Sequence, residues 1–260
     1  MAKLKGKITL ITGASSGIGE ACAHAFAGEE SNLILIGRRT DRLEKLADQL
    51  SQQYPIECLP LTLDIRNKTQ INERMSALPP KWQTIDILIN NAGLARGLDK
   101  IPHADTDDWD EMIDTNIKGL LYITRMVVPG MLERRQGDIV NIGSIAGHEV
   151  YAGGNIYCAT KHAVDAITKG LRIDLVDTPL RVSTVDPGLV ETEFSNVRFR
   201  GDSERAKTVY QGYQPLHSAD IADAVLYIVT RHPHVQIAEM IVFPTDQASS
   251  AIVHKQKHNG

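Results

Sequence analysis

Apolar residues occur along the chain in short runs that alternate with longer segments of helical periodicity. The run LILI at 33–36 is apolar at every position, which is typical of a strand buried on both faces. The pattern predicts strands at Ile8–Thr12, Leu33–Gly37, Glu57–Leu63, Ile85–Asn90, Asp138–Gly143, Leu180–Asp186 and Glu239–Phe243. It predicts helices over Gly17–Gly28, Asp41–Gln52, Asp107–Arg134 and Ile156–Val176.

The repeated order of strand, helix and strand implies right-handed crossovers and a parallel sheet. We find no internal repeat, low-complexity tract or linker in the sequence. The sequence therefore predicts one α/β domain over residues 1–250, followed by a short tail over 251–260.

The composition narrows the class of protein. Among the 260 residues, 42% are hydrophobic and 23% are charged, as in an ordinary globular protein rather than a disordered one. A net charge of −4 does not favour nucleic-acid binding, and no apolar run approaches the ~20 residues of a membrane helix. The basic N-terminus runs directly into a strand, so we expect no secretory signal. Three cysteines without a CxxC pair suit a reducing compartment such as the cytoplasm.

A glycine-rich turn, TGASSGIG at 12–19, joins the first predicted strand to the first predicted helix. The free N–H groups and the dipole of a helix N-terminus attract a pyrophosphate. Gly13 would permit the tight turn, Gly17 would let a ligand approach the backbone, and Gly19 would let helix and strand pack closely. A glycine-rich turn without a ligand is the alternative, but this context favours a dinucleotide contacted also by Ser15, Ser16 and Ile18.

The residues after the second and third strands indicate which dinucleotide is bound. No acid that would bind a ribose 2′-hydroxyl follows the second strand; Arg38 and Arg39 stand there instead. Guanidinium groups suit a 2′-phosphate, which predicts NADP, although solvated charges at a helix start are the alternative. Asp64 closes the third strand, where an adenine contact and a helix-capping role are both open.

Four polar residues form the candidate catalytic group. Tyr157 and Lys161 are spaced to share one helix face, and Ser144 follows a strand whose end faces the same crevice as the glycine turn. Asn116 falls on the apolar stripe of the helix predicted over 107–134. A buried amide without partners costs ~1–3 kcal/mol, so Asn116 should bond either to a disrupted helix turn or near Lys161, or to both.

These motifs together resemble the short-chain dehydrogenase/reductases over almost the full length of the chain. The residues that carry the resemblance are TGASSGIG at 12–19, NNAG at 90–93, Asn116, Ser144, Tyr157, Lys161 and DPG at 186–188. The resemblance implies a Rossmann-type, doubly wound, seven-stranded parallel sheet with helices on both faces, and a homotetramer joined through the helices 107–134 and 156–176.

The resemblance also implies site residues. The catalytic tetrad would be Asn116, Ser144, Tyr157 and Lys161. NADP would be contacted by Asn90, Ala92, Gly93, Pro187 and Gly188, and the nicotinamide carboxamide by Val190 and Thr192. A tyrosine with a pKa of ~10 needs roughly 4 kcal/mol in favour of phenolate to act near pH ~7, which one cation at ~4 Å supplies. We expect Lys161 to be that cation and Ser144 to donate to the substrate oxygen.

A narrower resemblance concerns the second half of the chain. The segments YAGGNIY at 151–157 and PGLVETEFSNVRF at 187–199 are similar to NADP-dependent 3-hydroxy acid dehydrogenases. This implies hydride transfer between NADP(H) and serine-like 3-hydroxy acids, or the matching semialdehydes and sulfonated aldehydes. The alternatives are a broad-range carbonyl reductase, a 3-oxoacyl carrier-protein reductase, and a non-catalytic NADP(H)-binding sensor.

An acidic substrate needs donors in the pocket, because an unpaired buried anion is costly. Arg198 is the first candidate, with Arg96 and Arg200 as alternatives and Asn155 as a further amide donor. We expect the loop that carries Arg198 to be a mobile lid. We expect no metal site from the sequence, because no HExxH motif occurs. Two close pairs exist, His232 with His234 and His254 with His258, and the second lies in a basic tail with no acid or cysteine nearby to complete a site.

Overall fold

The computed structural model describes residues 2–255 and contains a seven-stranded parallel sheet, with the strand order β3-β2-β1-β4-β5-β6-β9. Its strands are β1 (Ile8–Thr12), β2 (Asn32–Gly37), β3 (Cys58–Thr62), β4 (Ile87–Asn90), β5 (Asp138–Ile142), β6 (Arg181–Pro187) and β9 (Glu239–Val242). Each matches a predicted strand to within a few residues. The predicted fold class, a doubly wound Rossmann-type sheet, is confirmed.

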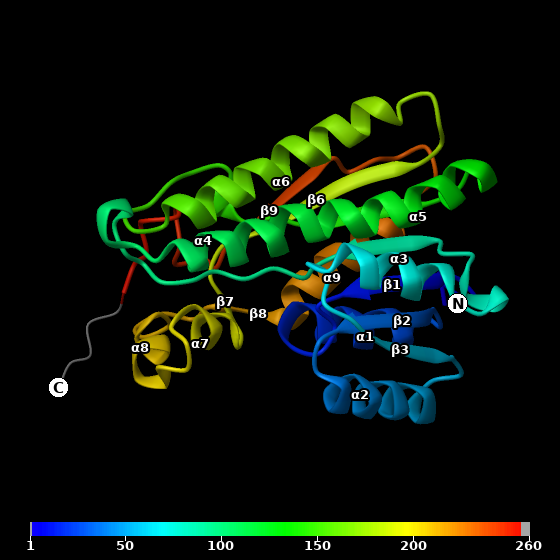
Figure 1. Ribbon diagram of the computed structural model, residues 1–260, viewed down its shortest axis with the longest axis horizontal. Coiled ribbons are helices and arrows are strands. Elements are labelled where there is room, and N and C mark those ends of the chain that lie inside the picture. Colours follow the sequence, from blue (N-terminus) through cyan, green and yellow to red (C-terminus); the bar gives the residue numbers. More distant parts are fainter. Residues whose placement is uncertain (1, 256–260) are drawn as a thin grey trace.

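Helices cover both faces of the sheet (Figure 1). The helices are α1 (Gly17–Gly28), α2 (Thr40–Gln53), α3 (Lys68–Ser76), α4 (Thr106–Ile113), α5 (Leu120–Arg134), α6 (Asn155–Asp174), α7 (Phe194–Arg198), α8 (Ser203–Thr208) and α9 (Ser218–Val229). One core cluster joins α1, α2 and α9 to the sheet, and a second joins α3, α5 and the end of α6 to the opposite face. Alternate residues serve the two cores: Ile34 and Ile36 of β2 point to the second, and Leu33 and Leu35 to the first.

The predicted helix over 107–134 is interrupted in its hydrogen-bond pattern. A π-helical turn over Asp114–Gly119 separates α4 from α5 and carries Asn116. The periodic apolar stripe that predicted one helix does not reveal this extra residue in the turn, because a π-turn adds only a single residue to the pattern.

The segment after β6, expected as a loop, has regular structure. It contains α7 and α8 and a two-stranded parallel pair of β7 (Val190–Glu191) with β8 (Leu216–His217). In Figure 1, α7 and α8 stand beside the carboxyl ends of the strands. At the C-terminus, Val253 pairs with Gln247, so residue 253 folds back on the domain. Residues 256–260 of the predicted tail, including His258, lie outside the described residues, and the boundary at 250 stays a prediction.

The strand order positions the site. β1 and β4 are neighbours, yet the chain continues from β1 to β2 on one side and from β4 to β5 on the other. At such a switch point the connecting segments diverge and leave a crevice at the carboxyl ends of the strands. The glycine turn after β1 and Ser144 after β5 therefore lie at the same edge of the sheet.

Candidate active site

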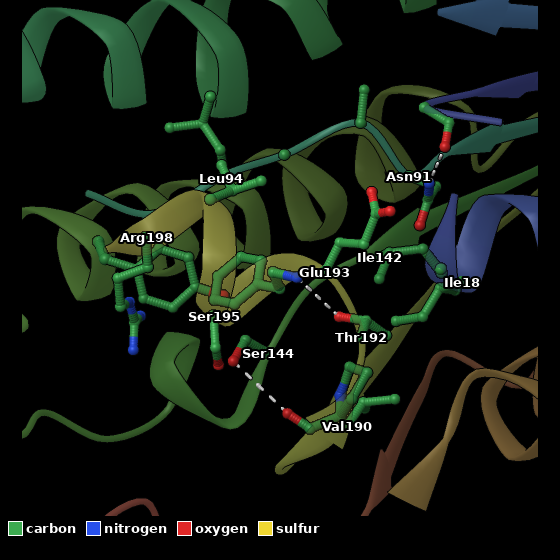
Figure 2. Close-up of a pocket in the computed structure, with 18 of the residues that line it drawn as sticks. Ile18, Asn91, Leu94, Ile142, Ser144, Val190, Thr192, Glu193, Ser195 and Arg198 are labelled. Atoms are coloured by element: carbon green, nitrogen blue, oxygen red, sulfur yellow. Dashed lines mark hydrogen bonds between the residues drawn. The ribbon is translucent and has the colours of Figure 1, made fainter. Parts of the chain in front are cut away.

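A cavity of about 550 Å³ lies at the carboxyl ends of the strands. It extends from the glycine turn to the side chains of α6 and α7, and Figure 2 shows Asn91 and Ile18 at one end and Arg198 and Leu94 at the other. The predicted site residues that line it are Gly13, Ser15, Ser16, Gly17, Ile18, Arg38, Arg39, Asp64, Ala92, Gly93, Ser144, Tyr157, Lys161, Pro187, Gly188, Val190, Thr192 and Arg198. Volumes of this size are typical of cofactor and substrate sites.

The glycine turn has the conformation that a close ligand approach requires. Gly13 has φ +67°, and a Cβ added there would lie 2.9 Å from Ala92 Cα, so only glycine fits between β1 and the segment after β4. A Cβ on Gly19 would clash with the Gly13 carbonyl oxygen. Asn91 holds the turn from β4, since its Nδ2 donates to the carbonyl oxygens of Thr12 (2.9 Å) and Gly13 (3.2 Å).

Arg39 bridges the glycine turn and the segment before α7. Its guanidinium donates to the hydroxyl oxygens of Ser15 and Ser16, the latter at 2.6 Å, and forms an ion pair with Glu193 at 2.8 Å. Arg42 binds the second carboxylate oxygen of Glu193 at 2.8 Å. These two arginines lower the pKa of Glu193, so the carboxylate is charged at neutral pH. Arg38 also lines the cavity and is exposed.

Asp64 lines the cavity but does not cap a helix, because Asn67 is the N-cap of α3. The Asp64 carboxylate accepts hydrogen bonds from the Arg66 guanidinium, the shortest at 2.6 Å. Burial alone would raise the pKa of Asp64, but the hydrogen bonds and charge of Arg66 outweigh burial and hold the pKa below its ordinary value. The adenine contact remains the open role for this residue.

Tyr157 and Lys161 lie on one face of α6, and Ser144 faces them from the end of β5. The Tyr157 ring is buried and packs edge-on against Phe194, with ring centroids 5.6 Å apart. Lys161 donates to the Ile142 carbonyl oxygen at 2.8 Å, and its Nζ lies 5.9 Å from the Tyr157 ring centroid. The Ser144 N–H donates to Asp186 Oδ1 at 3.1 Å, which fixes the turn that presents the serine hydroxyl.

The charges around Tyr157 differ from the sequence-based expectation. Burial raises the pKa of its phenol well above the ordinary value, and the Arg198 charge is the strongest influence acting against that rise. We expected Lys161 to supply this charge. Burial instead lowers the pKa of Lys161 to about 8, because the ammonium sits among the strand ends with only partial compensation from Asp186.

Asn116 is held by the π-turn and faces the segment after β4. Its Oδ1 accepts from the Leu94 N–H (2.9 Å), and its Nδ2 donates to the Leu94 carbonyl oxygen (2.8 Å) and to Thr160 Oγ1 (3.0 Å). The amide is therefore satisfied by backbone and by the residue next to Lys161, not by Lys161 itself. It does not line the cavity.

Arg198 places a cation beside the Tyr157 ring. Its guanidinium carbon lies 5.1 Å from the ring centroids of both Tyr157 and Phe194. One nitrogen, Nη2, donates to the Tyr151 hydroxyl at 2.8 Å, whereas the buried Nε has no hydrogen-bond partner among the described residues. The other two candidate arginines are engaged elsewhere: Arg96 pairs with Glu111, and Arg200 pairs with Asp108.

Some predicted residues lie outside the cavity. Asn90 is turned into the sheet, where its Nδ2 donates to Thr124 and Asn141, and Asn91 lines the cavity beside it. Asn155 is exposed at the start of α6 and borders a separate small pocket. Gly19 does not line the cavity but packs against the Gly13 carbonyl group behind the turn. Sequence reasoning missed Tyr151, Glu193 and Tyr210 as lining residues, because their neighbours in the cavity come from distant parts of the chain.

A family model described as "short chain dehydrogenase" matches residues 7–202. This chain belongs to the short chain dehydrogenase family. The predicted family is thus confirmed, and with it the dehydrogenase class of enzyme. No helix within residues 2–255 has both the length and the apolar character needed to cross a membrane.

Two kinds of relative within this family are similar over nearly the whole chain. An NADP-dependent 3-hydroxy acid dehydrogenase of Schizosaccharomyces pombe is 45% identical and covers 99% of this chain and 100% of its own length. A solved closed form of serine dehydrogenase complexed with NADP+ is 45% identical, has a TM-score of 0.90, and covers 96% of this chain and 100% of its own. Serine dehydrogenase from Escherichia coli is 41% identical, with a TM-score of 0.81 over 93% of this chain and 99% of its own.

Proposed function

We propose that this protein is an NADP-dependent 3-hydroxy acid dehydrogenase that acts on serine-like substrates. The similarity of two relatives of that name and activity over nearly the full chain supports the proposal. The observation that carries it is the Arg198 guanidinium beside the Tyr157 ring, because a half-buried cation next to the proton donor suits a substrate with a carboxylate near its reacting carbon.

The residues fit NADP. The cavity runs from the glycine turn to Tyr157, and Arg38 and Arg39 line its far end, where they would bind the 2′-phosphate. The first turn of α1, with Gly17 and Ile18, would hold the pyrophosphate. Val190 and Thr192 would hold the nicotinamide carboxamide, with Ala92, Gly93, Pro187 and Gly188 lining the floor. When bound, NADP supplies the hydride acceptor or donor.

The side chains around the reacting carbon handle the proton and the orientation. In oxidation, Tyr157 takes the hydroxyl proton as the carbonyl forms, and in reduction it returns that proton to the oxygen. The Ser144 hydroxyl donates to the same oxygen and stabilises the developing charge. Lys161 would bind the nicotinamide ribose, and the charge of Arg198 acts against the rise that burial causes in the pKa of Tyr157. Asn116 positions Lys161 indirectly through Thr160, the residue before it in α6.

Arg198 fixes the other end of the substrate. A carboxylate bound there would place the 3-hydroxyl between Tyr157 and Ser144, since the guanidinium already contacts the Tyr157 ring. Phe194, which packs on the same ring, excludes water from this end and strengthens the attraction between arginine and anion. Asn155 borders the neighbouring pocket, from which it would reach the substrate only after movement of the segment around Arg198.

We further propose a homotetramer in the cytoplasm. Large apolar side chains on the helices expected to pair between subunits are exposed, with Leu121 at 41% on α5 and Ile173 at 72% on α6. The three cysteines are all unpaired, which suits a reducing compartment.

The test is turnover of a substrate panel, followed at the reduced nicotinamide absorbance with NADP+ and NAD+. We expect serine, allo-threonine and other 3-hydroxy acids to be oxidised with NADP+ at far higher kcat/KM than alcohols of equal length that lack the carboxylate. Equal kcat/KM for acids and neutral alcohols would support a broad-range carbonyl reductase instead. Activity only on acyl carrier-protein thioesters, or none on any alcohol despite NADP binding, would overturn the proposal.

A further inference from the structure

A second group of polar residues meets behind the active-site turn, and none of them lines the cavity. His148 follows the turn that begins at Ser144, Asp186 lies in β6, and Glu239 begins β9. His148 Nε2 lies 3.4 Å from Asp186 Oδ2 and 3.4 Å from Glu239 Oε1. The three potential ligand atoms all lie within 4.8 Å of one another.

The structure satisfies only one side of the Asp186 carboxylate. Its side chain is 2% exposed, and Oδ1 accepts from the Ser144 N–H (3.1 Å) and from Thr184 Oγ1 (3.0 Å). Oδ2 points to His148 Nε2, yet within residues 2–255 neither atom has a partner in hydrogen-bond geometry. Buried polar atoms are nearly always paired, so two that face each other without a bond point to a missing third participant.

The two nearby lysines do not neutralise the negative charge of Asp186 and Glu239. Lys169 is half-exposed and is committed to Asp165 at 2.7 Å; it reaches only the outer oxygen of Glu239, at 4.0 Å. Lys161 acts on Asp186 from the cavity side, where its ammonium donates to Ile142. A neutral imidazole between two carboxylates would leave net negative charge in a largely buried place, which is costly without a cation.

We propose that His148, Asp186 and Glu239 bind one divalent transition-metal ion, with zinc as the best match. Zinc takes imidazole and carboxylate ligands at about 2.1 Å, and a tetrahedron with such bonds has ligand-to-ligand edges of about 3.4 Å. Both ligand-to-ligand distances from His148 have this value. The two carboxylate oxygens lie within 4.8 Å of each other, and a movement of the half-buried Glu239 side chain would bring them to the same separation.

The choice of zinc over magnesium or calcium follows from the histidine. Imidazole suits zinc and its neighbours in the first transition series, whereas magnesium and calcium prefer oxygen ligands alone. Three protein ligands leave a fourth position for water. The bonds that Asp186 Oδ1 makes to Ser144 and Thr184 would orient the carboxylate for the metal, as second-shell hydrogen bonds do in known sites.

The ion would join the turn after β5, the end of β6 and the start of β9 directly behind Ser144. It would therefore stabilise the fold and hold the Ser144 turn, without touching substrate or cofactor. This inference does not depend on the proposed substrate, and a failure of either leaves the other intact.

The test uses the full-length enzyme after treatment with a chelator. We expect titration calorimetry with zinc chloride to give one equivalent bound, and zinc to raise the thermal midpoint by roughly 5 °C at saturation. Cobalt(II) should show the visible absorption of a four-coordinate site. His148→Ala and Glu239→Gln should each weaken zinc binding at least ~10-fold and lose the cobalt spectrum. The control is His232→Ala with His234→Ala, since those two rings stack at 6.0 Å on a surface segment and could bind zinc by themselves.

Four results would overturn the proposal. The first is unchanged zinc affinity in both His148→Ala and Glu239→Gln. The second is loss of binding only in the His232→Ala, His234→Ala variant. The third is a wild-type protein that zinc neither binds nor stabilises. If that protein gains stability as the pH falls through the histidine range, and His148→Ala lacks the gain, a protonated His148 is the missing cation. Equal stabilisation by magnesium would refute the assignment to a transition metal.

Discussion

The two ends of the active-site cavity differ in what their cations already contact. At the cofactor end, Arg39 is bound by Ser15, Ser16 and Glu193, and Glu193 is also bound by Arg42. At the substrate end, the half-buried Arg198 donates a hydrogen bond to the Tyr151 hydroxyl, and its buried Nε has no hydrogen-bond partner among the residues described.

This difference determines what each end gains from an anion. A phosphate at Arg39 must replace or accommodate a carboxylate, so its net gain is a difference between two anions. A carboxylate at Arg198 adds an anion to a cation that has no ion pair among residues 2–255, so most of the interaction counts toward binding. We therefore expect perturbations at the substrate end to have larger effects than those at the cofactor end.

Tyr157→Phe should have the largest effect. Removal of the phenolic hydroxyl abolishes the proton transfer while preserving the ring that packs against Phe194, so kcat should fall at least ~100-fold with nearly unchanged NADP affinity. Tyr151→Phe is the matched control, since it removes a neighbouring hydroxyl whose hydrogen bond, among the described residues, is with Arg198. Turnover of Tyr157→Phe near the wild-type rate would remove Tyr157 from its role.

Arg198→Ala tests the substrate end directly. Loss of a charge-assisted contact should raise KM for acidic substrates ~10-fold or more, with much less change for neutral alcohols or aldehydes. Arg198→Lys should recover part of the difference, and Arg200→Ala should have little effect because Arg200 is paired with Asp108 on the surface. If KM rises by the same factor for acidic and neutral substrates, Arg198 is not the anion site.

The sequence predicted the scaffold of this site better than its contacts. The strands could be recognised because buried parallel strands require unbroken apolar runs such as LILI at 33–36, a local property of the chain. Gly13 could be recognised because a tight turn before a helix requires a positive φ. The helices α3 and α9 were missed: α3 has a polar surface with little periodicity, and α9 lies beyond the recognised motifs.

The contacts between distant segments could not be predicted in this way. Arg39 and Glu193 are 154 positions apart, and the pairing depends on how the segment after β6 returns over the glycine turn. The partners of Asn116 depend on a π-turn that changes the hydrogen-bond pattern of the helix without changing its apolar stripe. The group of His148, Asp186 and Glu239 comes from three different segments, so no spacing motif marks it.

Arg38→Ala with Arg39→Ala tests the cofactor end. The double variant should narrow the preference for NADP(H) over NAD(H) by ~1–3 kcal/mol, the scale of charge-assisted hydrogen bonds. The measurement is kcat/KM for both cofactors at a fixed saturating substrate. A wild-type enzyme that uses NAD(H) equally well or better would contradict the assignment of these arginines.

Lys161→Met tests how much the burial of the Lys161 ammonium in the cavity costs in folding free energy. Its pKa is about 8 in the folded protein against 10.5 for the ordinary side chain, so the cost of burying the charge is full below pH ~8 and is relieved as the pH rises toward the unfolded value. The free energy of unfolding in urea should therefore rise by about 1 kcal/mol from this group between about pH 7.5 and about pH 9. Cys22 has the opposite effect on the free energy of unfolding: burial raises its pKa to about 12, so it lowers that free energy as the pH rises above its ordinary value of 9.0. The pH dependence of the wild type must therefore be compared with that of variants. Lys161→Met should lose this rise, and Lys118→Met, an exposed lysine paired with Asp114, should keep it. An identical pH dependence in all three proteins would show that Lys161 is not buried as a charge.

Glu193→Gln should have the smallest effect on cofactor affinity, and the direction of the change distinguishes two roles for Glu193. The carboxylate that occupies Arg39 and Arg42 is charged, and it would repel a 2′-phosphate brought to the same arginines. The ion pairs are about 40% exposed, so the expected change is that of a surface pair, ~0.2–1 kcal/mol. NADP+ should therefore bind up to about five-fold more tightly to Glu193→Gln, whereas NAD+ affinity should not change, because NAD+ lacks the 2′-phosphate.

The gain should shrink at high salt, where exposed charges are screened. Glu191→Gln, two residues earlier on β7, is the control and should bind both cofactors as the wild type does. The measurement is the dissociation constant of each cofactor by titration calorimetry at low and high ionic strength. Weaker NADP+ binding in Glu193→Gln would mean that Glu193 orders Arg39 for the phosphate rather than competing with it, and the two ends of the cavity would then both be prepared for their anions in advance.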